Sequence, residues 1–167
     1  MKKNPNIIWL FGDQHRAQSL SFTGDPNLNT PNIDRLAHEG TFFRNAVAGC
    51  PLCCPYRGAL ISGRYPHRAV AGHEQQLSPE LPTIATAFQQ NGYSTAYFGK
   101  WHLDGFREVH GRAAMHRIPP ERRGGFEKWC AFENNNSQFD SWVHGGEGEE
   151  SFHDRLPGYE TDALTDA

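Results

Sequence analysis

Segments with strand and helix patterns alternate along this chain. A continuous apolar run at residues 6–11 predicts a strand in the centre of a parallel sheet, covered on both faces. Residues 30–40 predict a helix, because Thr30 can cap it, Pro31 suits its first turn and Gly40 can end it. Further strands are predicted at residues 41–47, 94–98 and 128–133, and further helices at residues 55–62, 81–92 and 161–167. This alternation predicts an α/β fold.

The segments between these elements read as loops with some buried aromatic residues. Loops are predicted where glycine, proline, histidine or charged residues gather, at residues 63–81, 104–128 and 144–150, the last of them acidic and flexible. Residues 133–136 offer hydrogen-bonding groups that could suit a sugar, although a run of asparagines is more typical of a turn. We expect the core to take up three tryptophans, Trp101, Trp129 and Trp142.

Composition excludes several classes of protein. Of the 167 residues, 37% are hydrophobic and 21% are charged, which suits one globular domain. A net charge of −3 and a pI near 6.3 argue against a nucleic-acid partner. No run approaches the ~20 apolar residues that span a membrane. The apolar run at residues 7–11 is too short for a signal peptide, and three cysteines crowd into residues 50–54, so we expect a reducing, cytoplasmic location.

One short segment carries the chemistry, the run from Cys53 to Arg64 with the sequence CCPYRGALISGR. Pro55 suits a first helical turn, which puts Cys53 at or just before a helix N-terminus. Arg57 lies about one turn further along, on the same face. The helix dipole and the guanidinium both favour negative charge at position 53. The segment therefore predicts an activated nucleophile that faces an anionic substrate.

The cysteines also allow other interpretations. Free cysteines pack like small hydrophobic residues, so the three could form a buried thiol cluster. Cys50 and Cys53 have the spacing of a redox pair or of half a zinc site. A structural zinc site needs two further ligands, and the sequence contains no second Cys-x-x-Cys pair. A small thiol-binding or metal-binding module remains the alternative that is not an enzyme.

Two further motifs could meet the cysteine segment in space. Asp13 and Gln14 follow the first predicted strand, where a carboxylate and an amide oxygen could bind a hard cation, although a polar loop cap is the simpler interpretation of the pair alone. Lys100 and His102 end a later predicted strand, and residues two apart on an extended segment point to the same side. Both could therefore reach one anion. His67 and His73, in the loop after the cysteine segment, could line the same pocket.

The pattern Cys-x-Pro-x-Arg followed by Leu-Ile-Ser-Gly-Arg, together with Gly-Lys-x-His at residues 99–102, resembles the type I sulfatase family of the alkaline phosphatase superfamily. The resemblance implies the N-terminal portion of a three-layer α/β/α sandwich with a mostly parallel central sheet. It also implies that a maturation enzyme oxidises Cys53 to formylglycine, whose hydrate is the nucleophile. In this family Arg57 would stabilise that hydrate, Lys100 would contact sulfate and His102 would contact the formylglycine hydroxyl.

The same resemblance implies a metal and a substrate. Asp13, Gln14 and the residue at position 53 would hold a divalent metal, which the resemblance implies is calcium. Gln14 replaces a commoner carboxylate, which should weaken metal affinity. Tyr56 stands where the family most often has serine or another small residue. The substrate would be a small sulfate ester or a sulfated carbohydrate, and the alternative is a phosphate or phosphonate ester.

Family members are longer chains, and the resemblance runs from Asn6 to the last residue. We therefore expect residues 1–167 to be an incomplete N-terminal part of a sulfatase catalytic domain, without the later metal-ligand segment and the C-terminal subdomain. Nothing after residue 103 resembles that metal-ligand segment. The 167-residue chain alone is accordingly expected to be inactive, so an inactive sulfatase fragment stays among the alternatives.

Overall fold

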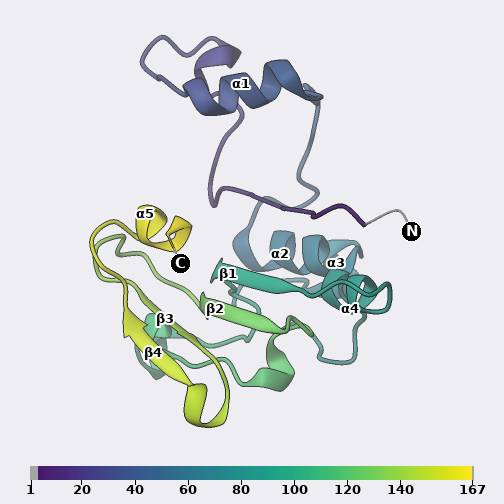
Figure 1. Ribbon diagram of the computed structural model, residues 1–167, viewed down its shortest axis with the longest axis vertical. Helices are drawn as coiled ribbons and strands as arrows, with labels where there is room; N and C mark the ends of the chain where they lie inside the picture. The colour runs from purple at the N-terminus through teal and green to yellow at the C-terminus, as the bar shows by residue number, and fades with distance from the viewer. Residues whose placement is uncertain (1–3, 167) are drawn as a thin grey trace. The chain divides into compact units, whose positions relative to one another are not determined.

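The computed structural model describes residues 4–166 and divides the chain into two compact units, Met1–Val47 and Ala48–Ala167 (Figure 1). Each unit is described here by itself. Within residues 4–166, no helix is both long enough and apolar enough to cross a membrane.

In the first unit, hydrogen bonds connect a short 3-10 turn to a helix. A 3-10 turn, η1 (Ser21–Thr23), contacts helix α1 (Pro31–Glu39). The helix begins and ends where the sequence predicts, but the predicted capping hydrogen bond to the Thr30 side chain is absent. The Thr30 hydroxyl donates to one oxygen of Asp34 at 2.7 Å, and the Ser21 hydroxyl donates to the other at 2.8 Å. These hydrogen bonds, with that from Thr30 the strongest, lower the pKa of Asp34. They tie the turn to the helix without a large apolar core.

The strands predicted at residues 6–11 and 41–47 are wrong. Both segments lack strand structure, and most of their side chains are exposed, with Ile8 91% exposed and Val47 89% exposed. An apolar run becomes a central strand only when neighbouring strands pair with it and other elements cover both of its faces. Among the described residues of the first unit there is only one α-helix and one 3-10 turn to do so.

The second unit is a four-stranded sheet with helices. Its strands are β1 (Ala96–Lys100), β2 (Lys128–Phe132), β3 (Trp142–Gly145) and β4 (Phe152–Arg155), in that order across the sheet. β1 and β2 are parallel, and the other two pairs are antiparallel. The helices are α2 (Cys53–Ser62), α3 (Pro66–Ala69), α4 (Ile84–Gln89) and α5 (Glu160–Thr165), and 3-10 turns lie at Glu108–His110, Ala113–Met115, Pro120–Arg122 and Gly148–Glu150. The predicted α/β class is confirmed, and the sheet of the described residues is mixed.

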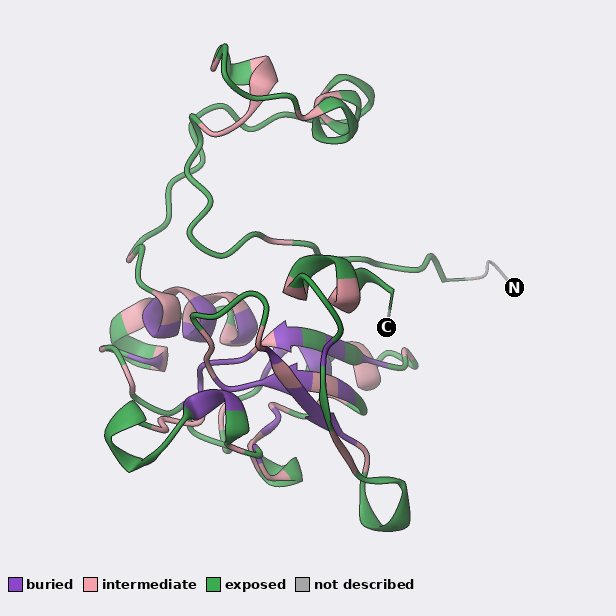
Figure 2. Cartoon of the chain, turned by 90° about the vertical axis from the view of Figure 1, so that its left-hand side faces the viewer, coloured by how far each residue is buried: buried purple, intermediate pink, exposed green. Residues whose placement is uncertain are grey.

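Side chains that alternate along β2 divide the core between the two faces of the sheet. Figure 2 shows that buried residues gather on the strands. Trp129 and Ala131 join a cluster with Cys54 and Ile61 of α2. The next residue, Phe132, joins a separate cluster to which α5 contributes Ala163 and Leu164. The sheet therefore has α2 against one face and α5 against the other, which is the layering that the sequence predicts.

The local predictions within this unit fare unevenly. α4 is shorter than predicted, and the Thr83 and Thr86 side chains form a reciprocal capping box at its start. The segment at residues 63–81 contains α3, which the loop prediction missed. Residues 104–128 are loops with short 3-10 turns, as expected, yet four of their residues are buried: Ala113, Ala114, Ile118 and Arg123. Trp101 and Trp129 lie in the core, whereas Trp142 is half-buried.

The prediction of a flexible loop from residue 144 is wrong at its first two residues. His144 and Gly145 belong to β3, and the His144 side chain is fully buried. Its Nε2 atom accepts a hydrogen bond from the Ile118 amide at 3.0 Å, which requires that nitrogen to be unprotonated. Burial lowers the pKa of His144 to about 3. A histidine that looked like part of a polar loop is thus a neutral core residue.

Candidate active site

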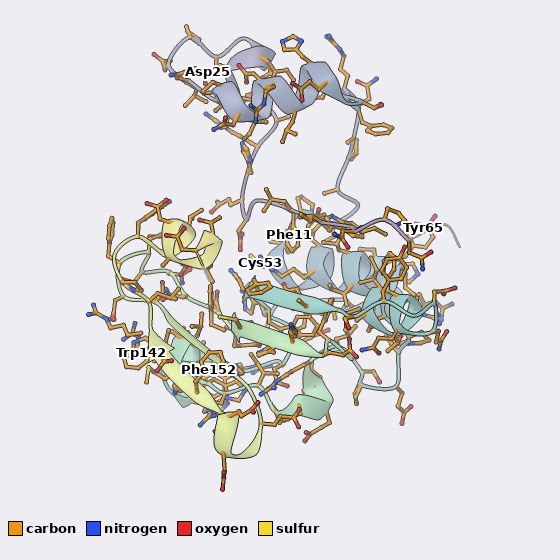
Figure 3. The ribbon with its side chains drawn as sticks, in the orientation of Figure 1. Phe11, Asp25, Cys53, Tyr65, Trp142 and Phe152 are labelled. Carbon is orange, nitrogen blue, oxygen red and sulfur yellow. The ribbon has the colours of Figure 1, made fainter. Side chains whose placement is uncertain are left out.

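Cys53 is the first residue of α2, as the position of Pro55 predicts, although the helix begins two residues before that proline (Figure 3). The proline occupies the third helical position, where its missing N–H costs no intrahelical hydrogen bond. Leu52 occupies the N-cap position and provides no side-chain cap. The helix dipole at this end favours a negatively charged group near position 53.

Lys100 reaches this helix start from the sheet. It is the last residue of β1, and its Nζ atom lies 3.6 Å from Cys53 Sγ. The sequence places these residues far apart, and the packing of α2 against the end of β1 brings them together. A half-buried thiol thus lies beside both an ammonium group and a helix N-terminus.

Arg57 fixes the same junction from below the surface. Its side chain is 4% exposed, and Nη1 donates to the Tyr97 hydroxyl at 3.2 Å and to the Lys100 carbonyl oxygen. The Tyr97 hydroxyl also donates to that carbonyl. Arg57 therefore links α2 to the end of β1 and holds the Lys100 backbone. Tyr97 was not among the predicted site residues, since nothing in a strand pattern marks its hydroxyl.

His102 comes to the site by a different backbone path from the one predicted. β1 ends at Lys100, and His102 has a φ of 53°, in the left-handed region. The expectation that Lys100 and His102 extend from one strand to the same side is therefore wrong in its geometry. The His102 side chain is 2% exposed, and its ring lies edge-on to the His73 ring with centroids 5.0 Å apart. His102 still lies near the start of α2, because a ring nitrogen is within 4.8 Å of Cys54 Sγ.

Adjacent cysteines differ sharply in environment. Cys54 is fully buried, and its sulfur accepts a hydrogen bond from the Glu74 amide at 3.3 Å. Burial raises the pKa of the Cys54 thiol to about 11, so this thiol stays protonated and unreactive near neutral pH. Cys53 is only partly buried and has Lys100 beside it. The structure thus separates one accessible thiol from one core thiol.

Glu133 is a buried carboxyl that the sequence interpretation did not assign to the site. It follows β2 and is fully buried, and it accepts hydrogen bonds from the Asp104 amide at 3.0 Å and the Phe106 amide at 3.4 Å. Burial raises its pKa to about 7. These bonds hold the chain just after His102. The run of asparagines after Glu133 predicts a turn, and nothing in that pattern indicates a buried carboxyl.

Asp13 and Gln14 form an exposed turn in the first unit, and Gln14 has a φ of 50°. They do not follow a strand, contrary to the prediction. A metal site that includes this turn and position 53 stays a prediction.

Comparison with known proteins decides the family. The sulfatase family model matches residues 5–167. This chain belongs to the sulfatase family. It is 44% identical over 130 residues to an ulvan-active sulfatase of Formosa agariphila, which covers 77% of this chain and 24% of that protein. It is 32% identical over 165 residues to an N-acetylglucosamine-6-O-sulfatase of Bacteroides thetaiotaomicron, covering 98% and 26% of the two chains.

Similarity extends to solved sulfatase-type structures. One, from work on the metabolism of multiple glycosaminoglycans by Bacteroides thetaiotaomicron, superposes with a TM-score of 0.78 at 26% identity, covering 94% of this chain and 37% of that one. The sulfatase chain thus spans between about a quarter and somewhat over a third of the length of these relatives.

Proposed function

We propose that this protein hydrolyses sulfate esters and that the residue derived from Cys53 is the nucleophile. The observation that carries the proposal is the approach of Lys100 Nζ to within 3.6 Å of Cys53 Sγ at the first residue of α2. A cation and a helix N-terminus at one atom favour an anionic group there. Membership of the sulfatase family and the printed functions of the relatives support sulfate as that anion.

In this proposal a formylglycine-generating maturation enzyme acts on Cys53. The formylglycine would supply a hydrated aldehyde whose hydroxyl attacks sulfur, so that the S–O bond to the alcohol breaks and the alcohol leaves. Loss of a proton from the second hydroxyl would then re-form the aldehyde and expel sulfate. Lys100 would bind a sulfate oxygen as a point charge and offset negative charge in the transition state. Arg57 would hold Lys100 in place through the Lys100 carbonyl and the Tyr97 hydroxyl. His102 would accept a proton from the second hydroxyl at a ring nitrogen.

A divalent metal belongs to the same proposal. Asp13 offers a carboxylate and Gln14 an amide oxygen, and these hard donors suit calcium better than a soft metal. Both residues lie in an exposed turn. The metal would neutralise the sulfate oxygens as a Lewis acid. The residue at position 53 would supply a third ligand to the same metal.

Sulfated carbohydrate is the substrate class that the relatives favour. Two of them are named for ulvan and for N-acetylglucosamine 6-O-sulfate. A phosphate or phosphonate ester is the second candidate, because Gln14 in place of a carboxylate leaves that class of substrate open.

The test is an assay of the natively expressed protein with aryl sulfate, sulfated oligosaccharide, aryl phosphate and aryl phosphonate. Sulfate release should exceed phosphate release, and Cys53→Ala should abolish it, whereas the matched Cys50→Ala variant should keep it. Sulfate release that survives Cys53→Ala would refute the proposed nucleophile. A preference for the phosphorus esters would support the second candidate instead.

A further inference from the structure

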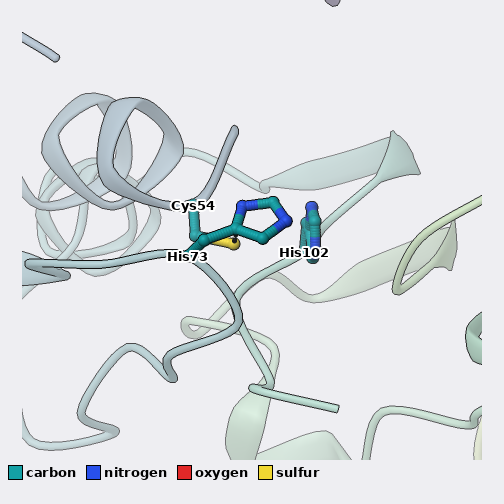
Figure 4. Close-up of side chains that lie close together, drawn as sticks. All are labelled: Cys54, His73 and His102. Atoms are coloured by element: carbon teal, nitrogen blue, oxygen red, sulfur yellow. Dashed lines mark hydrogen bonds between the residues drawn. The ribbon is translucent and has the colours of Figure 1, made fainter. Parts of the chain in front are cut away.

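Three side chains from separate parts of the second unit converge beside the candidate nucleophile. Cys54 comes from α2, His73 from the loop after α3, and His102 from the segment after β1 (Figure 4). One potential ligand atom from each lies within 4.8 Å of the others. Cys54 Sγ and His73 Nδ1 are 3.8 Å apart. The catalytic proposal uses His102 but assigns no role to Cys54 or His73.

Spacing within this cluster is close to that of zinc ligands. With Zn–S near 2.3 Å and Zn–N near 2.0–2.1 Å, two ligands at a tetrahedral zinc lie roughly 3.5 Å apart. The Cys54–His73 pair already approaches that value. The widest separation, up to 4.8 Å, would have to close by about 1.3 Å, which side-chain rotations can provide.

The burial of two of these groups and the exposure of the third also suit a metal site. Cys54 and His102 lie in the core, where a thiol and an imidazole have little contact with water. His73 is exposed, so an ion can reach the cluster from solvent. One thiolate and two imidazoles form a borderline-soft donor set that favours zinc over calcium.

We propose that Cys54, His73 and His102 form a binding site for a zinc ion, with the fourth position open to water. Binding transfers the Cys54 thiol proton to solvent, and sulfur then binds the ion as thiolate. This site differs from the proposed calcium site in its residues, its donor type and its preferred metal. If the proposed function holds, a bound zinc ion also occupies His102 and inhibits sulfate release.

Cobalt(II) is a suitable probe, because cobalt bound by a thiolate absorbs in the near ultraviolet whereas zinc is silent. The reduced, metal-free 167-residue chain is titrated with cobalt and then with competing zinc. We expect one cobalt ion per chain with a thiolate band, and displacement by zinc. Neither substrate nor formylglycine is needed, so failure here is separable from failure of the proposed function.

Variants identify the ligands. Cys54→Ala should remove the thiolate band, and His73→Ala should weaken binding by at least about tenfold. Cys53→Ala and Cys50→Ala, which remove the neighbouring thiols, should retain the band. His73 is exposed, so its replacement tests the site even if Cys54→Ala unfolds. A band that persists in Cys54→Ala, a band lost in Cys53→Ala, wild-type affinity in His73→Ala, or no binding to the folded chain would each overturn the proposal.

Discussion

Lys100 Nζ lies 3.6 Å from Cys53 Sγ, although 47 residues separate them in the sequence. The contact depends on Arg57, which binds the Lys100 carbonyl oxygen and the Tyr97 hydroxyl from within α2. The start of a helix and the end of a strand are thereby joined by one buried guanidinium. The reactive position, its cation and the group that aligns them come from two elements of the second unit.

Replacing Arg57 by lysine should weaken this junction. Lysine keeps the charge but lacks the planar fork, so it cannot serve both acceptors in the same way. We expect the chain to fold, with a free energy of unfolding lower by about 1–3 kcal/mol, and turnover of the natively expressed protein to fall strongly. Urea unfolding and an aryl sulfate assay measure the two effects. Arg68→Lys, at an exposed position, is the matched control. Full activity in Arg57→Lys would show that the junction does not serve catalysis.

Glu133 should make stability depend on pH. Its pKa rises from 4.5 to about 7 on folding, so the folded state holds this proton more tightly. Stability should therefore fall as pH rises from about 4.5 to about 7, by up to roughly 3 kcal/mol, and should level off above that range. Glu133→Gln cannot titrate, and its stability profile should be flatter across this window. Urea midpoints across the pH range measure the difference. Exposed Glu149→Gln is the control, and a wild-type slope in Glu133→Gln would contradict the account.

Gly58 should resist replacement even by alanine. A Cβ atom at this position would lie 2.7 Å from Val70 Cγ2 and 2.9 Å from Val70 Cβ. Alanine favours a helix by about 1 kcal/mol over glycine, but overpacking a core costs about 1–3 kcal/mol. We therefore expect net destabilisation of Gly58→Ala in urea unfolding. Val70→Ala should lower the free energy of unfolding less in the Gly58→Ala variant than in the wild-type chain. Additive effects of the two changes would mean that Gly58 and Val70 do not clash.

Calcium binding by residues 1–167 alone should be weak. Calcium takes about six to eight oxygen ligands, and Asp13, Gln14 and position 53 supply about half of that number. Isothermal titration of the purified chain should give little heat at calcium concentrations that saturate a complete site. Asp13→Asn should reduce what binding remains, with Asp25→Asn, in the same unit, as the control. Tight binding, or binding indifferent to Asp13, would contradict the proposed donor set.

Where local chemistry decides a structure, the sequence predicts it well. The proline in α2 and the flanking glycine of α1 mark their helices, because these residues act within one turn. The place of Cys53 at the start of α2 followed from the same reasoning. The α/β class followed from the alternation of the elements, and the family was recognisable from the cysteine motif.

Where distant partners decide, the sequence interpretation falls short. The apolar run at residues 6–11 predicts a buried strand, yet burial depends on elements that the run cannot specify. His144 looks like a loop residue and Glu133 like the last residue of a strand before a turn. Neither pattern indicates that the Ile118 and Asp104 amides reach these buried side chains from other segments. The cluster of Cys54, His73 and His102 was equally hidden, since three segments had to fold before it formed.

The central claim is that Cys53 provides the nucleophile and that its neighbours do not. Peptide mass spectrometry after co-expression with a formylglycine-generating enzyme tests it most directly. We predict that Cys53 loses its sulfur and gains a carbonyl oxygen, whereas Cys50 and buried Cys54 remain thiols. Conversion at Cys54 or Cys50 with an intact Cys53 thiol, or no conversion at any of the three, would contradict the account.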